Sequence, residues 1–227
     1  MRGSAEQRQM KILIFGATGS AGGSVLRACL ASPVVEEVRA VVRRPPVLAD
    51  PKLRAIVHGD FLDYSPIADA FAGVDACLFC LGISATQVPG EAEYRGITHD
   101  FALAAARALR AGSPEASFHF ISGQGANADS RFMWARVKAE TERDLIAEVA
   151  ALCWRPAAIG GVPSRSEPRL FKIMRPLLRL LSPFRSLYIK GEDLGRAMLL
   201  AAVENLRGRI LENRDIRDLA DRARGRV

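Results

Sequence analysis

The sequence contains few of the residues that build metal centres and disulfide scaffolds. Its 227 residues include three histidines and four cysteines. No two of the histidines have metal-ligand spacing, so we predict no metal site. The cysteines fall within predicted strands and helices and not in loops at the spacing of a disulfide framework, which favours a reduced, cytoplasmic protein. The histidines are His58, His99 and His119, and the cysteines are Cys29, Cys77, Cys80 and Cys153.

Long apolar runs and hydrolase motifs are also missing from the sequence. No uninterrupted apolar stretch approaches the length of a membrane span. The first nine residues, MRGSAEQRQ, lack the apolar core of a signal peptide, so we expect residues 1–10 to form a disordered leader. There is no G-x-S-x-G motif and no paired arrangement of carboxylates, which argues against serine-hydrolase and glycosidase chemistry.

The net charge of +7 is concentrated in one segment. Seven basic residues and one acid lie between Arg165 and Lys190, and few aromatics are interleaved with them, which argues against nucleic-acid binding. Apolar residues at helical spacing within 168–183 are compatible with a basic amphipathic helix that binds an anionic membrane or an acidic protein partner. We favour instead a lid over a substrate cleft, within the segment 163–190, because a lid buries its leucines without a partner.

Apolar strand-like runs alternate with helical patterns along the rest of the chain. This alternation, with 49% hydrophobic residues and a mean hydropathy of +0.06, predicts one α/β domain over residues 11–227, a doubly wound parallel sheet of the Rossmann type with right-handed crossovers. The expected strands are Ile12–Phe15, Val38–Val42, Ala55–His58, Ala76–Leu81, Ser117–Ser122 and Leu152–Arg155. The expected helices are Gly22–Ala31, Tyr94–Ala111, Met133–Ala150 and Glu192–Glu204, with an irregular turn near Ser65–Ala72.

The stretch KILIFGATGSAG, residues 11–22, is the most informative part of the chain. A short apolar strand runs directly into three glycines with the spacing G-x-x-G-x-x-G, and a helical segment follows. Such a turn lets the backbone approach a pyrophosphate, which the free N–H groups of the helix start then bind. We therefore predict a dinucleotide site here, formed by Gly16, Thr18, Gly19, Ser20 and Gly22.

The residues that follow the second strand bear on the choice of cofactor. NAD-selective sites place an acid at this strand end to bind the ribose 2′-hydroxyl, whereas an arginine accommodates a 2′-phosphate. Arg43 and Arg44 stand here, and Glu36 and Glu37 fall before the expected strand. We therefore predict a site for NADP(H) in preference to NAD(H). The alternative is that both arginines are solvated loop residues without a cofactor contact.

The third and fourth strand ends supply further candidates for cofactor contacts. Asp60 and Phe61 follow the third strand, where a carboxylate could bind an adenine and the aromatic ring could flank it; the alternative is an ordinary turn aspartate. Leu81 and Gly82 follow the fourth strand, and a glycine there permits close approach of the cofactor.

Ser122 ends the fifth strand, and the helix after it carries Trp134-Ala135-Arg136-Val137-Lys138. With the glycine turn, these residues resemble the extended or atypical short-chain dehydrogenases/reductases, and most closely their Tat-interacting-protein-like branch, a group of NADPH-binding, oxidoreductase-like proteins. The resemblance runs through FISGQGA and WRPAAIGG to ILENRDIRDLA near the end of the chain. It implies a site in which a serine orients the substrate and a Y-x-x-x-K pair moves a proton and binds the nicotinamide ribose.

Ser122 and Lys138 match that pattern, but Trp134 stands at the tyrosine position. An indole N–H donates a hydrogen bond and does not shuttle a proton near neutral pH. The resemblance also places Pro156 beside the nicotinamide, although a plain strand end with a glycine turn fits these residues equally. Two hypotheses follow: an NADP(H)-dependent oxidoreductase acting on a small molecule, or a non-catalytic NADPH-binding sensor or scaffold with a protein partner. Either a monomer or a homodimer is compatible with the helix patterns.

Overall fold

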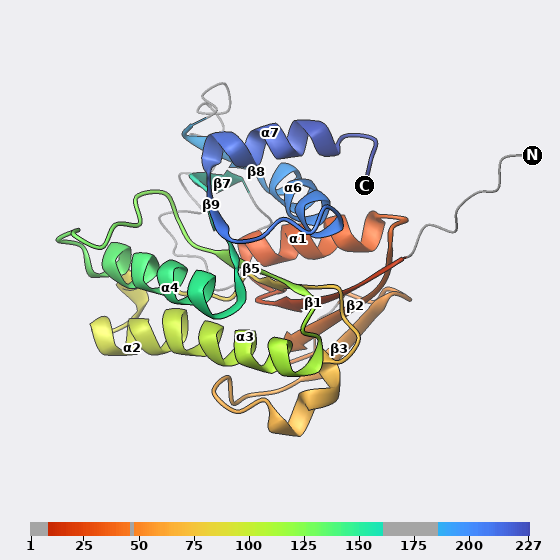
Figure 1. The fold of residues 1–227 in the computed structure, drawn as a ribbon, viewed down its shortest axis with the longest axis horizontal. Helices are drawn as coiled ribbons and strands as arrows, with labels where there is room; N and C mark the ends of the chain where they lie inside the picture. The colour runs from red at the N-terminus through yellow and green to blue at the C-terminus, as the bar shows by residue number, and fades with distance from the viewer. Residues whose placement is uncertain (1–8, 46–47, 161–185) are drawn as a thin grey trace, which may run out of the picture.

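Seven parallel strands form the centre of the molecule (Figure 1). The structure is a computed structural model that describes residues 9–45, 48–160 and 186–227. The strand order is β3-β2-β1-β4-β5-β6-β9, and every neighbouring pair is parallel. The strands are β1 (Met10–Phe15), β2 (Val35–Val42), β3 (Leu53–Val57), β4 (Ala76–Phe79), β5 (Ser117–Ile121), β6 (Leu152–Arg155) and β9 (Arg209–Glu212).

Helices cover both faces of this sheet, as expected for a doubly wound fold (Figure 1). One face carries α1 (Ser20–Ala31), α6 (Gly191–Val203) and α7 (Asn213–Ala223). The other carries the 3₁₀ segment η1 (Ser65–Phe71), α3 (Phe101–Gly112) and α4 (Met133–Val149). Between β4 and α3 lie η2 (Ala85–Gln87), α2 (Glu91–Arg95) and the π-helical turn η3 (Gly96–Asp100). A separate two-stranded sheet pairs β7 (Ala158–Gly160) with β8 (Tyr188–Lys190).

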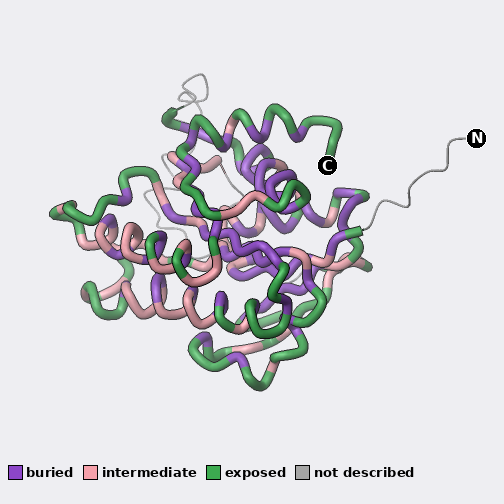
Figure 2. Tube along the Cα trace, viewed as in Figure 1, coloured by how far each residue is buried: buried purple, intermediate pink, exposed green. Residues whose placement is uncertain are grey.

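The apolar strands supply a core on both sides of the sheet, because successive side chains of a strand point to opposite faces. In β1, Ile12 and Ile14 pack under α1 and α6, whereas Leu13 and Phe15 pack under η1 and α3. Figure 2 shows the resulting buried strands at the centre and exposed loops around them. None of the described helices is both long and apolar enough to cross a bilayer.

The fold confirms the predicted α/β class and corrects several boundaries. Met10, which we expected to belong to a disordered leader, is the first residue of β1 and pairs with Val35. Glu36 and Glu37 lie within β2 and not before it. The expected long helix from Tyr94 is divided into α2, η3 and α3. The predicted lid segment, 163–190, lies outside the described residues except for 186–190.

The order in which the strands are added to the sheet reverses between β1 and β4. Moving outward from β1, the chain adds β2 and β3 on one side, and then β4, β5, β6 and β9 on the other. Open α/β sheets bind ligands at this reversal, in the crevice outside the carboxyl ends of the strands. The loops after β1, β2, β4, β5 and β6 are therefore the place to look for a functional site.

Helix α1, which begins at that reversal, is held in place by close contact with α6. A Cβ atom at Gly195 would come within 2.7 Å of the Ala28 Cβ and 3.0 Å of the Ser24 carbonyl oxygen. Since real Cβ atoms do not approach so closely, the glycine allows the two helices to touch through their backbones.

We predict that Gly195→Ala lowers the free energy of unfolding by about 1–3 kcal/mol, because the added methyl forces α1 and α6 apart. Gly96→Ala is the matched control: it is also helical, with nothing within 4 Å of the added atom. It should raise stability by up to about 1 kcal/mol. Urea unfolding of both variants checks this, and equal effects would contradict the packing argument.

Candidate functional site at the carboxyl ends of the strands

The turn after β1 is built on two glycines that have no room for a side chain. Gly16 has a φ of +71°, and a Cβ there would lie 2.5 Å from the carbonyl oxygen of Cys80, just after β4. A Cβ on Gly22, in the first turn of α1, would overlap the Gly16 carbonyl oxygen. The N–H of Gly19 donates a hydrogen bond to the Gly16 carbonyl oxygen at 2.9 Å. The turn thus brings β1, β4 and α1 into direct backbone contact.

Helix α1 begins directly after this turn. Gly19 is the N-cap residue, and it has no side chain with which to cap the helix. Thr18 is exposed and Ser20 is half-buried, so both stand at the rim of the turn. An uncapped helix start beside a glycine turn fits the pyrophosphate of a dinucleotide, since it offers N–H donors and the positive end of the helix dipole.

Arg43 and Arg44 follow β2 directly and are exposed. Neither forms an ion pair with another described residue. The acids of β2 do not take the place of a ribose-binding carboxylate: Glu36 lies near the opposite end of the strand, and Glu37 pairs with Arg39 at 3.2 Å. The two arginines are therefore the charged groups that this strand presents at the site.

The structure places Asp60 and Phe61 differently from our expectation. The Asp60 carboxylate accepts hydrogen bonds from the N–H groups of Leu62 and Asp63, at 2.9 and 3.3 Å, as an ordinary turn aspartate does. Phe61 is buried and stacks on Phe101, with ring centroids 5.5 Å apart. We correct the expectation that its ring stands open to an adenine. Contact through the exposed Asp60 stays a prediction.

Leu81 and Gly82 lie at the reversal of strand order, after the Cys80 carbonyl that touches the glycine turn. Leu81 is half-buried, and nothing lies within 4 Å of a Cβ atom placed on the exposed Gly82. Space for a ligand therefore exists at Gly82. The nearby thiols of Cys77 and Cys80 pack into opposite faces of the sheet, as residues three apart in a strand should, and burial raises the pKa of both.

Lys138 connects α4 to the carboxyl end of β5. Its Nζ donates to the carbonyl oxygens of Ser122, at 2.6 Å, and Ile121, at 3.3 Å. Burial lowers the pKa of Lys138 to about 8. The Ser122 Oγ is buried without a hydrogen-bond partner among the described residues. The lysine nitrogen therefore lies at the carbonyls where the fifth strand ends, beside a residue whose hydroxyl is unpaired.

Trp134 lies one helical turn before Lys138, on the same side of α4. Its ring is half-buried against the loop after β5, where a Cβ on Gly125 would come within 3.4 Å of the Cη2 atom. Another tyrosine could in principle supply the missing acid, and Tyr94 is one candidate, but it is 2% exposed on α2, and burial raises its pKa. A buried phenol with a raised pKa is a poor proton donor, so Tyr94 does not replace the missing tyrosine.

The end of β6 is held by a residue that the sequence reasoning missed. Pro156 is buried, and its carbonyl accepts a hydrogen bond from Gln124 at 3.1 Å. The next N–H, of Ala157, donates to Asn213 Oδ1 at 2.9 Å, and Asn213 Nδ2 donates to the Tyr188 carbonyl at 3.3 Å. Asn213 is 1% exposed at the start of α7. Its place in ILENRDIRDLA was the available signal, but only the folded chain shows what it contacts.

Two further features lie away from these strand ends. His99, Glu140 and Asp144 could together offer metal ligands, but Arg95 binds both Glu140 oxygens and Arg143 pairs with Asp144.

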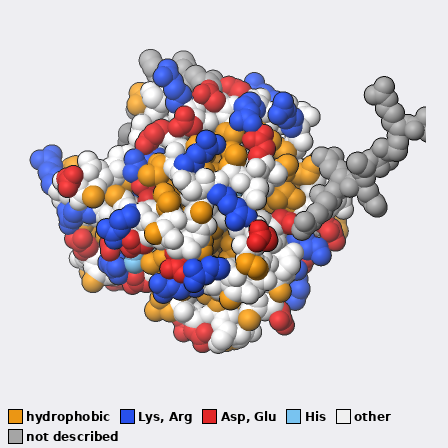
Figure 3. Space-filling model, in the orientation of Figure 1, with side chains coloured by type: hydrophobic (Ala, Val, Ile, Leu, Met, Phe, Trp, Pro, Cys, Tyr) orange, Lys and Arg blue, Asp and Glu red, His pale blue; other side chains and the backbone are white. Residues whose placement is uncertain are grey.

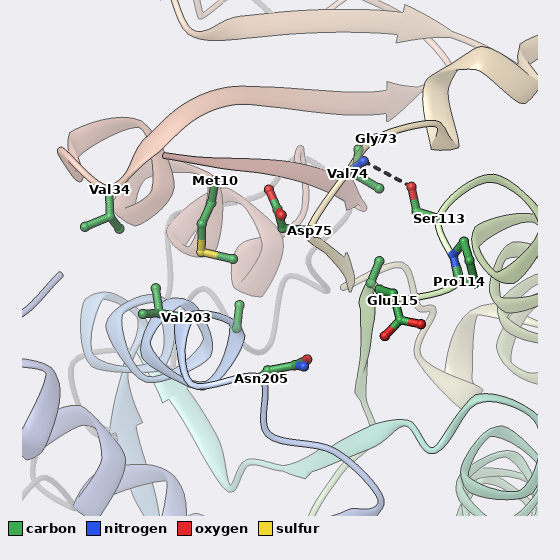
Figure 4. A pocket seen from close by; sticks show the side chains of 12 residues that line it. Met10, Val34, Gly73, Val74, Asp75, Ser113, Pro114, Glu115, Val203 and Asn205 are labelled. Atoms are coloured by element: carbon green, nitrogen blue, oxygen red, sulfur yellow. Dashed lines mark hydrogen bonds between the residues drawn. The ribbon is translucent and has the colours of Figure 1, made fainter. Parts of the chain in front are cut away.

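A hollow of 540 Å³ opens at the amino ends of the strands, opposite the glycine turn, with Asp75, Glu115 and Asn205 facing it (Figure 4). It contains none of the predicted site residues. The molecular face in Figure 3 carries basic and acidic side chains interspersed.

The glycine turn, the uncapped helix and the groups after β5 fit a bound dinucleotide and define the class: a Rossmann-type nucleotide-binding domain. Residues 16–151 match a protein family described as NAD(P)H-binding. The chain belongs to this NAD(P)H-binding family. The match covers the glycine turn, both strand-end arginines, Ser122 and Lys138.

Curated relatives of the chain include fungal proteins. The chain is 33% identical to "Protein FMP52, mitochondrial" of Saccharomyces cerevisiae over 139 residues, 61% of this chain and 60% of that protein. It is 28% identical to "Protein fmp52-2, mitochondrial" of Aspergillus oryzae over 200 residues, 83% of this chain and 85% of that protein. The matched region spans only three fifths of the length of the Saccharomyces cerevisiae protein.

Solved structures show the same fold at low identity. An oxidoreductase of the short-chain dehydrogenase/reductase family from Burkholderia thailandensis superposes with a TM-score of 0.67 and 17% identity, over 92% of this chain and 93% of that one. The Bordetella bronchiseptica enzyme WbmF, in complex with NAD+, has a TM-score of 0.68 and 11% identity, over 98% of this chain and 81% of that one. Both confirm the α/β Rossmann-like fold.

The relatives also overturn one expectation. We expected a cytoplasmic protein, and the fungal relatives are named as mitochondrial proteins. The expectation rested on unpaired cysteines, and the four cysteines are indeed free. Free thiols separate reducing from oxidising surroundings and do not separate one reducing compartment from another, so the inference was wrong.

We predict that Gly22→Ala weakens NAD(P)H binding at least tenfold, because the added methyl displaces the Gly16 carbonyl and deforms the turn. Gly90→Ala, where nothing lies within 4 Å of the added atom, is the control and should leave affinity unchanged. Titration of NADPH fluorescence measures both. Unchanged affinity in a folded Gly22→Ala protein would show that the turn does not bind the cofactor.

Proposed function

We propose that the chain is an NADP(H)-dependent oxidoreductase of the atypical short-chain dehydrogenase type, within the Tat-interacting-protein-like branch, acting on a small molecule. One observation carries the proposal: the Lys138 ammonium and the unpaired Ser122 hydroxyl lie together at the carboxyl end of β5. A buried hydroxyl without a partner costs free energy, which a ligand that bonds to it recovers.

The residues divide the work of such a site. The start of α1 binds the pyrophosphate, and Arg43 and Arg44 bind the 2′-phosphate that distinguishes NADP(H) from NAD(H). The Lys138 ammonium, with two protons directed at the Ser122 and Ile121 carbonyls, offers its third to a nicotinamide ribose hydroxyl. The Ser122 hydroxyl orients the substrate. When bound, the cofactor supplies a hydride.

Trp134 limits the substrates that this site can reduce. Reduction of a carbonyl needs a hydride at carbon and a proton at oxygen, and the Trp134 indole provides no such proton. We infer a substrate that accepts hydride without an enzymic acid, such as a flavin or a quinone, with the proton taken from water.

A second function, a non-catalytic NADPH-binding sensor or scaffold, is favoured by the same residue. Trp134 stands where the acid belongs, and the candidate substitute, Tyr94, is buried on α2. The protein partner of such a scaffold would bind the basic segment 165–190, most of which lies outside the described residues. A steady-state assay of NADPH oxidation with carbonyls, quinones and flavins separates the two functions, since a scaffold shows no turnover.

We predict that the double variant Arg43→Ala/Arg44→Ala loses about tenfold or more in NADPH affinity, because a hydrogen bond to a charged group contributes about 1.5–3 kcal/mol. NADH affinity should not change. Arg54→Ala removes an exposed arginine from the neighbouring edge strand and serves as the control for net charge. An unchanged NADPH affinity would mean that the two arginines are solvated loop residues, and equal losses for both cofactors would contradict their assignment to the 2′-phosphate.

We predict that Trp134→Tyr gains about 100-fold in NADPH-dependent carbonyl reduction, because it places a phenol one helical turn from Lys138 and general acid catalysis contributes about this much. NADPH affinity should stay within twofold, roughly. Trp134→Phe supplies a ring without the hydroxyl and should show no gain. A tyrosine variant no faster than the phenylalanine variant would refute the assignment of this position.

A further inference from the structure

A buried carboxylate lies one helical turn beyond Lys138. Glu142 is 1% exposed on α4, and residues four apart in a helix share a face. A buried charge is costly unless it is paired. Neither the sequence pattern nor the proposed chemistry assigns this residue a role.

Glu142 is paired with Arg155, the last residue of β6. Arg155 Nε donates to Glu142 Oε1 at 2.9 Å, and its Nη2 donates to Oε2 at 2.6 Å, which is a bidentate arrangement. Arg155 Nη1 also donates to Glu212, at the end of β9, at 3.0 Å. These contacts raise the pKa of the guanidinium. The ion pair therefore joins α4 to the carboxyl end of the sixth strand.

The two attachments of α4 to the sheet act on adjacent strand ends. Lys138 binds the carbonyls at the end of β5, and Glu142 binds Arg155 at the end of β6. The strand ends are themselves joined, because the Ser122 N–H donates to the Trp154 carbonyl at 2.7 Å. Successive turns of α4, which carry Lys138 and Glu142, are therefore attached to adjacent, hydrogen-bonded strand ends.

The Lys138 ammonium lies near one acidic side chain, Glu142, which is itself paired with the basic Arg155. Its partners on β5 are neutral carbonyls, and the Phe120 ring centroid lies 5.6 Å from Nζ. The Glu142 carboxylate opposes the effect of burial on the Lys138 pKa, whereas Arg155 is neutralised by Glu142 and Glu212. Among the described residues, Glu142 is thus the acid that favours a charged Lys138.

We propose that Glu142, held by Arg155, is a positioning residue for Lys138, which keeps its ammonium group charged and aimed at the end of β5. The inference rests on the proposed function in one respect, since it takes Lys138 to bind the nicotinamide ribose. A neutral amine has one proton fewer than the ammonium, and with two protons directed at carbonyls none remains for a ligand.

The test is the pH dependence of acetylation of Lys138 by acetic anhydride in the full chain, followed by mass spectrometry of its peptide. In the native protein we expect half-maximal reactivity near pH 8, as the pKa of about 8 requires. In Glu142→Gln the midpoint should fall by at least about half a pH unit, because the favourable charge is gone. Lys52, whose Nζ bonds to the Ser32 carbonyl, is the internal control and should not move.

Glu142→Gln leaves Arg155 without its main partner, and a protein that fails to fold would not report on Lys138. Glu142→Gln/Arg155→Met removes both charges of the buried pair and leaves only the exposed Glu212 without its partner, and the Lys138 midpoint should fall in it as well. Glu148→Gln, on the same helix but paired with Arg107 and Arg110, should not change the midpoint. An unmoved Lys138 midpoint in a folded variant that lacks the Glu142 charge would overturn the proposal.

A second measurement connects the charge to binding. NADPH affinity should fall with rising pH in the native protein, and Glu142→Gln should lose affinity at a lower pH, in step with acetylation. A native protein without NADPH affinity would refute the proposed function while acetylation still tests the ion pair. An NADPH-binding protein whose pH profile is the same in both variants would refute the role of Glu142 alone.

Discussion

The structure depends on one close approach of backbone to backbone, where the glycine turn meets the end of β4. Gly16 lies against the Cys80 carbonyl, and Gly22 lies against Gly16. A single methyl group at either position would separate the first strand from its neighbour or from its helix. Because of this contact, the uncapped start of α1 opens over the reversal of strand order, where the other strand ends also converge.

The site also depends on the position of α4 relative to the carboxyl ends of β5 and β6. Lys138 and Glu142 attach the helix at two points one turn apart, to a strand end each. Asn213 then fixes the chain after β6 by bonding to Ala157 and to the Tyr188 carbonyl. Binding groups are thus supplied by the strand ends, and the helices that cover the sheet determine where those groups point.

Much of the architecture was predictable because the relevant signals are local. The strands expected at Ile12–Phe15 and Leu152–Arg155 begin with continuous apolar runs, ILIF and LCW, and Gly16 and Pro156 follow where these strands end. The break at η3 was not predictable, since Gly96–Asp100 contains no proline that would mark an interruption of the helix. Strand β9 was missed because its exposed Arg209 and Ile210 give it no buried-strand pattern. At the site, Phe61 was misplaced because only the fold shows that Phe101 stacks on it.

By itself the sequence determined the class of fold, the glycine turn, the basic end of the second strand, and the tryptophan at the place of the usual tyrosine. These depend on residue identity at neighbouring positions, which short-range physical rules interpret. Only the tertiary structure decided which polar groups are satisfied and which remain open: Asp60 engaged in its own turn, the Ser122 hydroxyl without a partner, and Glu142 paired with Arg155. Those outcomes depend on contacts between residues far apart in the chain, whose distances are set when the sheet and its helices pack together.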